Sequence, residues 1–323
     1  MKLSINGTRF LQDDELTYTR IVGYPAADER LGGLLQAVDA RCCVADSASV
    51  AHTLAKAPVW RELGALAFTV ALQDDAGKGL FTPGGELQAE ALGNLKLLLA
   101  KAEELDLLPL VRCFSPAGNR LVREGLLGTA LDALVDWLLD AGYDRLIVDL
   151  RAGGPDREYW PSLRLDAVGG LIDRVRDAVD LHNMNWRHQR RLYIAASLAL
   201  PAPCDAPLPD LEPLIQRVDV VWVHLPDVGD EDGHIQRVLD MVGGDRGYPR
   251  PVLCQGRAGP ATLEQCLARR VSWVAAEAEG EWIAALAKRV GRPLDPRSVT
   301  LLQHHIKSGH QTVVRGRRHP VRY

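Results

Sequence analysis

The sequence predicts an α/β protein built as a single (β/α)8 barrel of the TIM type, with a short N-terminal β-hairpin. Strand-like and helix-like segments alternate from about residue 33 onward. The strand-like segments are continuous apolar runs, as expected where both faces of a parallel sheet are covered. Eight of them fit within 323 residues, an ordinary size for one such barrel. An open doubly wound sheet is the runner-up, but ALQDDAGKG (71–79) lacks the glycine spacing of a phosphate-binding loop.

The strands and helices follow one another in a regular order. The predicted strands span residues 33–40, 65–72, 107–114, 145–150, 191–197, 218–225, 251–255 and 271–276. The first connecting helix contains Pro58 and Trp60, and the next has leucines at helical spacing. A third helix stops at Gly142, where a C-terminal cap is expected. From the second helix on, the predicted helices span 87–106, 123–142, 163–180, 210–217, 233–242, 261–270, 281–290 and 295–309.

The two ends of the chain differ from the barrel segment. Residues 1–20 form a predicted β-hairpin cap with INGT as its turn, placed to plug the bottom of the barrel. Residues 21–310 make up the barrel. Residues 311–323 form a basic C-terminal tail that is poor in apolar residues, which is typical of a frayed terminus.

The composition is ordinary for a soluble globular protein, with 47% hydrophobic and 25% charged residues. A formal net charge of -4 gives no electrostatic reason to expect nucleic-acid binding. The sequence contains no apolar run of the length of a signal peptide or a membrane span, so we expect a cytoplasmic protein with no membrane partner. The six cysteines form no C-x-x-C pair, which favours buried free thiols.

Three stretches carry a resemblance to a known family. They are VWRELGALAFTVALQ (59–73), FTPGGELQAEALGNLKLLLAKAEELDLLPLVRCF (81–114) and ALVDWLLDAGYDRLIVDL (133–150). Together they resemble a bacterial family of cellulase-like glycoside hydrolases, which are (β/α)8 barrels of the retaining clan that includes glycoside hydrolase family 5. The resemblance covers residues from about 20 to 305. It implies the barrel fold and a carbohydrate ligand.

The resemblance also implies that both catalytic glutamates are missing. In the family, the fourth strand ends in the glutamate that acts as general acid/base, and the seventh strand ends in the nucleophile. IVDLRAGG (147–154) places Gly153 at the first position, and PVLCQGRAG (251–259) places Gly256 at the second. Retaining glycosidases need two carboxyl groups roughly 5–5.5 Å apart. We therefore expect no catalytic residue at either position and a catalytically degenerate barrel.

Other positions are candidates for ligand binding. The resemblance implies that His224, at the end of the sixth strand, lies near a sugar and that Trp273, in the eighth strand, forms an aromatic platform. A purely structural role stays open for each. Tyr159 and Trp160 follow the fourth strand, and aromatic side chains at a barrel mouth bind sugars or protein partners. Gln255 is a further candidate beside the nucleophile position.

Carboxylates elsewhere offer an alternative chemistry. Asp149 lies deeper in the fourth strand, and we expect a buried ion pair with Arg112 on the third strand. Asp156, Glu158 and Asp227 lie in loops and are candidates for relocated catalytic acids, although a solvated charged loop is the reading that we favour for them.

The sequence indicates neither a cofactor nor a metal. It has no H-E-x-x-H, no calcium loop and no G-x-S-x-G element. Three hypotheses remain: a pseudoenzyme that binds an oligosaccharide or acts as a scaffold, an active glycoside hydrolase with relocated carboxylates, and an interaction protein with Tyr159 and Trp160 in its interface. We favour the first hypothesis, which overlaps with the third. The expected partner is either an oligosaccharide ligand or another protein, and the sequence leaves the oligomeric state open.

Overall fold

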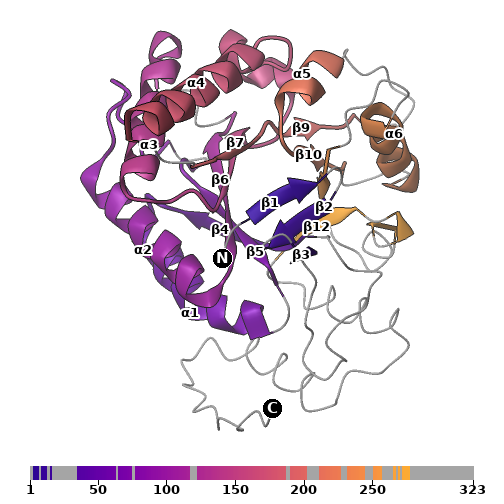
Figure 1. Cartoon of the computed structure of the whole chain (residues 1–323), viewed down its shortest axis with the longest axis horizontal. Coiled ribbons are helices and arrows are strands. Elements are labelled where there is room, and N and C mark those ends of the chain that lie inside the picture. Colours follow the sequence, from indigo (N-terminus) through magenta and orange to yellow (C-terminus); the bar gives the residue numbers. More distant parts are fainter. Residues whose placement is uncertain are drawn as a thin grey trace, which may run out of the picture.

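Parallel strands form a curled sheet at the centre of the molecule, and helices cover its outer face (Figure 1). This arrangement is the predicted (β/α)8 barrel. The computed structural model describes residues 3–6, 9–12, 15–16, 35–62, 65–74, 77–116, 122–186, 190–201, 211–226, 231–243, 250–256, 265–266, 268–269 and 271–276.

Nine strand segments make up the eight strands of the barrel. They are β4 (Gln36–Cys43), β5 (Ala67–Ala71), β6 (Leu108–Phe114), β7 (Ile147–Arg151), β8 (Tyr193–Ala195), β9 (Leu198–Ala199), β10 (Val221–His224), β11 (Val252–Gln255) and β12 (Ser272–Ala276). Their order is β8-β7-β6-β5-β4-β12-β11-β10-β9, and every pairing is parallel. Because β8 and β9 are consecutive halves of one strand, the pairing of β9 with β10 closes the ring. A bridge between Ala195 and Val220 supports the closure.

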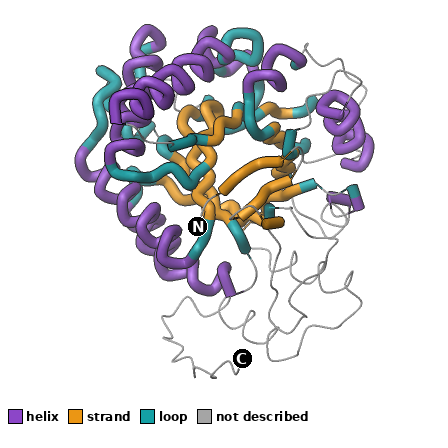
Figure 2. The backbone as a smooth tube through the Cα atoms, viewed as in Figure 1, coloured by secondary structure: helices purple, strands orange, loops and turns teal. Residues whose placement is uncertain are grey.

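The helices form an outer layer around these strands (Figure 2). They are α1 (Ser47–Glu62), α2 (Ala89–Leu105), α3 (Leu127–Asp140), α4 (Gly169–Trp186), α5 (Glu212–Arg217) and α6 (Glu231–Gly243). The start of α4 comes six residues later than predicted, because the chain first makes tight turns after Pro161. The helices predicted over 281–290 and 295–309 and the tail lie outside the described residues, as does most of 261–270.

Two strands depart from their predicted bounds for local reasons. The first strand runs to Cys43 rather than residue 40, across a register shift where Arg41 adopts a positive φ of 46°. The fifth strand is broken before Leu198. At the break, the backbone N–H of Ser197 is shared between the Asp149 carboxylate at 2.8 Å and the Arg151 carbonyl at 3.2 Å, so a side chain competes with the regular strand hydrogen bond.

A small N-terminal sheet lies across one end of the barrel (Figure 1). It contains three antiparallel strands, β1 (Leu3–Asn6), β2 (Arg9–Gln12) and β3 (Glu15–Leu16), so the predicted hairpin has one strand more than expected. Phe10 is fully buried and packs in a cluster with Leu35, Leu108 and Tyr193. These residues lie at the amino ends of barrel strands, so Phe10 fills that end of the barrel.

Alternation of side chains along the strands produces two apolar layers. One lies inside the lower barrel and includes Ile147 and Trp222, and the other lies between strands and helices and includes Val148 and Leu150. Membership of these layers tells which way each strand side chain points, because successive residues face opposite sides of a sheet.

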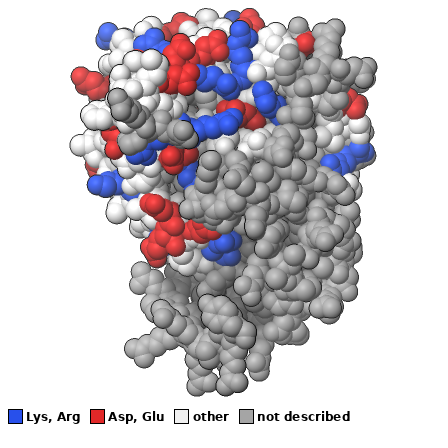
Figure 3. Space-filling view, viewed as in Figure 1, with Lys and Arg blue, Asp and Glu red and all other residues white. Residues whose placement is uncertain are grey.

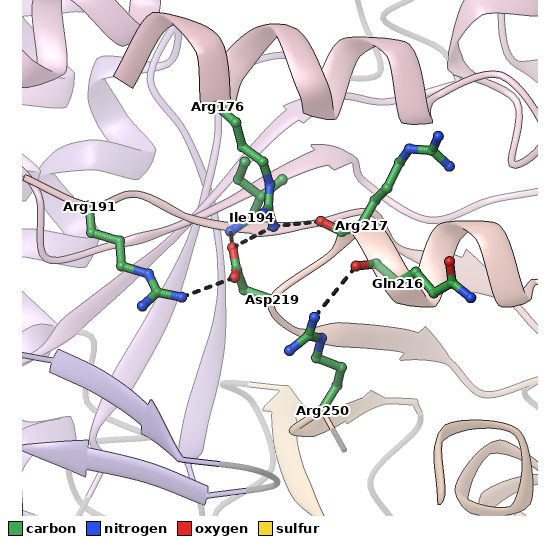
Figure 4. A network of polar contacts seen from close by, with 7 residues as sticks. All are labelled: Arg176, Arg191, Ile194, Gln216, Arg217, Asp219 and Arg250. Atoms are coloured by element: carbon green, nitrogen blue, oxygen red, sulfur yellow. Dashed lines mark hydrogen bonds and ion pairs between the residues drawn. The ribbon is translucent and has the colours of Figure 1, made fainter. Parts of the chain in front are cut away.

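A polar network closes the amino-terminal side between β8 and β10 (Figure 4). The buried Asp219 carboxylate accepts hydrogen bonds from Arg176 of α4 and from Arg191, each at 3.3 Å, and from the backbone N–H of Ile194 at 3.0 Å. Arg250 reaches the carbonyl of Gln216. The network therefore joins α4, β8 and the approach to β10 where the broken strand has few backbone bonds.

The surface and the cysteines fit the composition. Acidic and basic side chains are interspersed over the described part of the face in Figure 3, rather than separated into regions of one sign. None of the described helices combines the length and apolar character needed to cross a bilayer. Five free cysteines are buried, and Cys204 lies outside the described residues.

Candidate functional site

The carboxyl ends of the barrel strands present a set of polar side chains to the interior. Each is in phase with an interior apolar residue of its own strand, two or four positions earlier, so each points into the barrel. We call this set the mouth, and its members are Asp39, Thr69, Arg112, Asp149, Arg151, Trp222, His224 and Gln255. Active sites of TIM barrels lie at this end.

At Gly153, which the resemblance matches to the general acid/base, another residue fills the space where a side chain would lie. Gly153 has a φ of +82°, and a Cβ built on it would lie 2.6–2.7 Å from three ring atoms of His224. No side chain fits there while His224 keeps its place. The structure thus brings these two predicted site residues together.

The second position requires a correction. A Cβ on Gly256 would meet the Cβ of Leu225 at 3.1 Å, and Leu225 belongs to the layer between strands and helices. Residue 256 therefore faces away from the mouth. Gln255 is the inward residue at the end of β11, in register with Val274 of β12. The residue that points into the mouth at the end of β11 is therefore the amide Gln255 and not Gly256.

Gln255 is oriented by both of its amide atoms. Its Nε2 donates to Asp39 at 3.1 Å, and its Oε1 accepts from the Trp222 indole N–H at 3.2 Å. The other Asp39 oxygen accepts from the Thr69 hydroxyl at 2.8 Å. Asp39, Thr69 and Trp222 were not among the sequence candidates. Alternation back from His224 identifies Trp222, but only the closed barrel places β4 beside β12 and one strand away from β11.

Asp149 has a different partner from the one predicted. Its carboxylate is fully buried and accepts hydrogen bonds from the Ser197 hydroxyl at 2.5 Å and the Ser197 N–H at 2.8 Å. The expected ion pair with Arg112 does not form; the Arg112 charge acts only at longer range to lower the pKa of Asp149. Burial dominates and raises that pKa to about 6.

Arg151 and the loop after β7 form one unit. The Arg151 side chain is 0% exposed, and its Nη1 pairs with Asp156 at 2.6 Å. Its guanidinium carbon lies 4.4 Å from the centre of the Tyr159 ring, whose hydroxyl donates to the Gly153 carbonyl. Asp156 also accepts the Leu165 N–H at 2.9 Å. Asp156 and Tyr159 therefore hold this loop in place instead of standing free for catalysis or for a partner.

Arg112 and His224 complete the centre of the mouth. Arg112 donates to the Ala152 carbonyl and lies 5.8 Å from the Trp222 ring centre. The Trp222 and His224 rings are stacked, with centroids 6.3 Å apart. Burial, then the charges of Arg112 and Arg151, hold the pKa of His224 well below its usual value. The imidazole is therefore neutral at pH 7.

The remaining candidates lie away from the mouth. Trp273 is 2% exposed and packs in the layer between strands and helices, so it forms no sugar platform inside the barrel. Trp160 is half-buried against the same layer. Glu158 is exposed, and Asp227 lies outside the described residues. No group of three His, Cys, Asp or Glu side chains suited to a metal ion occurs in the described part of the chain.

Comparison with known proteins gives structural neighbours only. No family model and no curated protein matches the sequence. The β-1,4-mannanase of the common sea hare Aplysia kurodai superposes with a TM-score of 0.57 at 10% identity, covering 89% of this chain and 96% of the mannanase. The β-mannanase of the blue mussel Mytilus edulis gives 0.55 at 9% identity, with coverage of 90% and 96%. At such identity the likeness establishes the barrel fold alone.

Proposed function

We propose that this chain is a catalytically degenerate glycosidase-type barrel that binds a saccharide at its mouth without hydrolysing it by the retaining mechanism. The observation that carries the proposal is the pair of residues at the inward ends of β7 and β11. Gly153 is covered by the His224 ring, and Gln255 carries an amide. Neither position supplies a carboxyl group.

The chemistry explains why this pair matters. A retaining glycosidase needs one carboxyl group to protonate the leaving oxygen and a second to attack the anomeric carbon, roughly 5–5.5 Å from the first. Glycine has no group to donate a proton, and the Gln255 amide does not ionise. The Gln255 amide is also held by Asp39 and Trp222, so it acts as a positioned hydrogen-bonding group.

The saccharide is inferred from the fold and from the polarity of the mouth. Two of the structural neighbours are mannanases, and their barrels cover nearly the same length as this one. The mouth contains amide, carboxylate, guanidinium and imidazole groups above Trp222, whose indole N–H donates to Gln255. Such hydrogen-bonding groups beside an aromatic ring suit a polyhydroxylated ligand.

The main alternative is an active hydrolase with relocated carboxylates at Asp156, Glu158 and Asp227. Asp156 is the least suited, because it is paired with Arg151 and accepts a backbone N–H. The scaffold alternative placed Tyr159 and Trp160 in an interface. The Tyr159 ring is instead buried beside Arg151.

The test combines thermal unfolding and product analysis on the same samples. The protein is incubated with manno-, cello- and xylo-oligosaccharides, and both the Tm and the released sugars are measured. We expect a Tm that rises with ligand concentration and no cleavage, because a ligand of the native state stabilises it by RT ln(1 + [L]/Kd). Gln255→Glu should stay inactive, because Gly153 still supplies no acid.

Two results would contradict the proposal. Cleavage by the wild type that disappears in an identically purified Asp156→Asn or Glu158→Gln variant would establish the relocated-carboxylate hydrolase. If none of the sugars raises the Tm and none is cleaved, carbohydrate binding is refuted and the scaffold alternative remains.

A further inference from the structure

The mouth contains buried nitrogen atoms, on two guanidinium groups and one imidazole, for which the described part of the chain supplies no hydrogen-bond partner. Arg151 is 0% exposed, yet its Nε and Nη2 have no hydrogen-bond partner within the described part of the chain. Arg112 Nε and His224 Nε2 are also buried and have no hydrogen-bond partner among the described residues. A guanidinium keeps its charge at any physiological pH, so it cannot relieve this cost by losing a proton. Buried polar groups without partners are rare in native proteins and call for an explanation.

The guanidinium groups of Arg112 and Arg151 both lie near the His224 imidazole. They project from neighbouring strands β6 and β7, and the charges of both lower the pKa of His224. Arg151 is paired with Asp156 through Nη1, which leaves its Nε and Nη2 without a partner among the described residues. A negatively charged group placed beside both guanidinium groups is stabilised by them.

The carboxylates in the mouth and in the loop beside it are already engaged. Asp149 is held by Ser197, Asp156 by Arg151 and the Leu165 N–H, and Asp39 by Thr69 and Gln255. None of these contacts uses Nε or Nη2 of Arg151, or Nε of Arg112. The described residues therefore supply no acceptor for these donors.

We propose that the ligand is an acidic sugar whose carboxylate binds between Arg112, Arg151 and His224. Guanidinium groups bind carboxylates through two parallel hydrogen bonds, which gives direction as well as strength. The glycosidase carboxylates would repel such a sugar, and here the inward ends of β7 and β11 carry none. This inference rests on the proposed saccharide-binding function and specifies the class of sugar.

The experiment compares matched probes on the full chain. D-glucuronate and D-galacturonate are tested against D-glucose and D-galactose, with acetate and inorganic phosphate as simple anions, by titration calorimetry and thermal shift. We expect binding of an acid sugar and much weaker binding of its neutral counterpart. Arg151→Met should weaken acid-sugar binding about ten-fold or more, as expected for loss of hydrogen bonds to a charged group.

Control variants separate binding from folding. Arg174→Met removes an exposed arginine that pairs with Asp132 on the helix layer, and it should bind the acid sugar like the wild type. If Arg151→Met does not fold by circular dichroism, Arg112→Met tests the same site, because Arg112 is half-buried and lacks the Asp156 pairing.

Each unfavourable outcome identifies what fails. Equal binding of acid and neutral sugars overturns this inference and leaves the proposed function standing. Acetate or phosphate binding as tightly as the acid sugar reduces the site to a simple anion site and overturns the acidic-sugar proposal. If none of the probes binds, this inference is overturned. If the neutral oligosaccharides also fail to bind, the proposed function is overturned as well.

Discussion

Gly153 is the residue on which the interpretation of the site depends most. Its positive φ of 82° is a conformation that side chains rarely adopt, and the His224 ring fills the space where a Cβ would lie. A glutamate at this position would therefore need both a new backbone conformation and a displaced histidine. The packing around residue 153 therefore leaves no room for a side chain while His224 keeps its place.

Gly153→Ala should destabilise the fold. We expect a loss of about 1–3 kcal/mol in the free energy of unfolding, from backbone strain and the contact with His224. Urea denaturation measures it. His224→Ala in the same chain should recover part of the loss by removing the ring.

Gly93→Ala is the matched control. Gly93 lies within α2, a Cβ added to it would meet nothing within 4 Å, and it has no positive φ. The substitution should stabilise by roughly 0.5–1 kcal/mol through helix propensity. If Gly153→Ala behaved like Gly93→Ala, the close approach of His224 to residue 153 would be refuted.

At the scale of elements, the N-terminal strands contribute a plug to the barrel. Phe10 of β2 enters the interior cluster, whereas Ile5 of β1 packs only partly against it. The turn and the alternating apolar residues predict a hairpin from the sequence. The side chain that reaches the core becomes evident only when β2 lies across the barrel.

Phe10→Ala should therefore cost more than Ile5→Ala. We expect a loss of about 3–5 kcal/mol for Phe10→Ala, from lost burial and a cavity in the barrel end. Ile5→Ala should cost under about 2 kcal/mol, because that side chain is only partly buried. Chemical denaturation of both variants tests the difference, and equal losses would mean that Phe10 does not plug the barrel.

Strand direction is a second feature at this scale. Alternation predicts that neighbours on a strand face opposite sides, but it does not tell which of two neighbours faces the interior. Gln255 and Gly256 illustrate the point. The resemblance matches Gly256 to the nucleophile position, whereas the register with β12 shows that Gln255 is the residue facing the interior. Trp273 faces the helices for the same reason, being one residue out of phase with Val274.

At the scale of the whole molecule, Asp149 links global stability to pH. Burial raises its pKa in the folded state to about 6, above the ordinary value of 3.8. The folded state therefore holds this proton more tightly than the unfolded state. The Asp149 contribution is most favourable below about pH 4 and is lost as pH rises through about 6.

Comparison of the wild type with Asp149→Asn isolates this effect. Between about pH 4 and 7, the unfolding free energy of the wild type should fall relative to the variant by on the order of 2–3 kcal/mol. Urea denaturation across that range measures it. Glu104→Gln, an exposed carboxylate paired with Lys101, is the control and should follow the wild type. A flat difference between wild type and Asp149→Asn would contradict the raised pKa.

The sequence by itself determined the barrel, because apolar runs and helical periodicity are local properties that eight repeated units express together. It also located the end of β7, where the apolar run gives way to Gly153 and Gly154. The tertiary structure alone decided the partners at the mouth. Asp39 and Gln255 are separated by 216 residues and meet only because the barrel closes. His224 reaches Gly153, and Ser197 replaces Arg112 as the partner of Asp149, because side-chain contacts across a closed sheet depend on register, which no short stretch encodes.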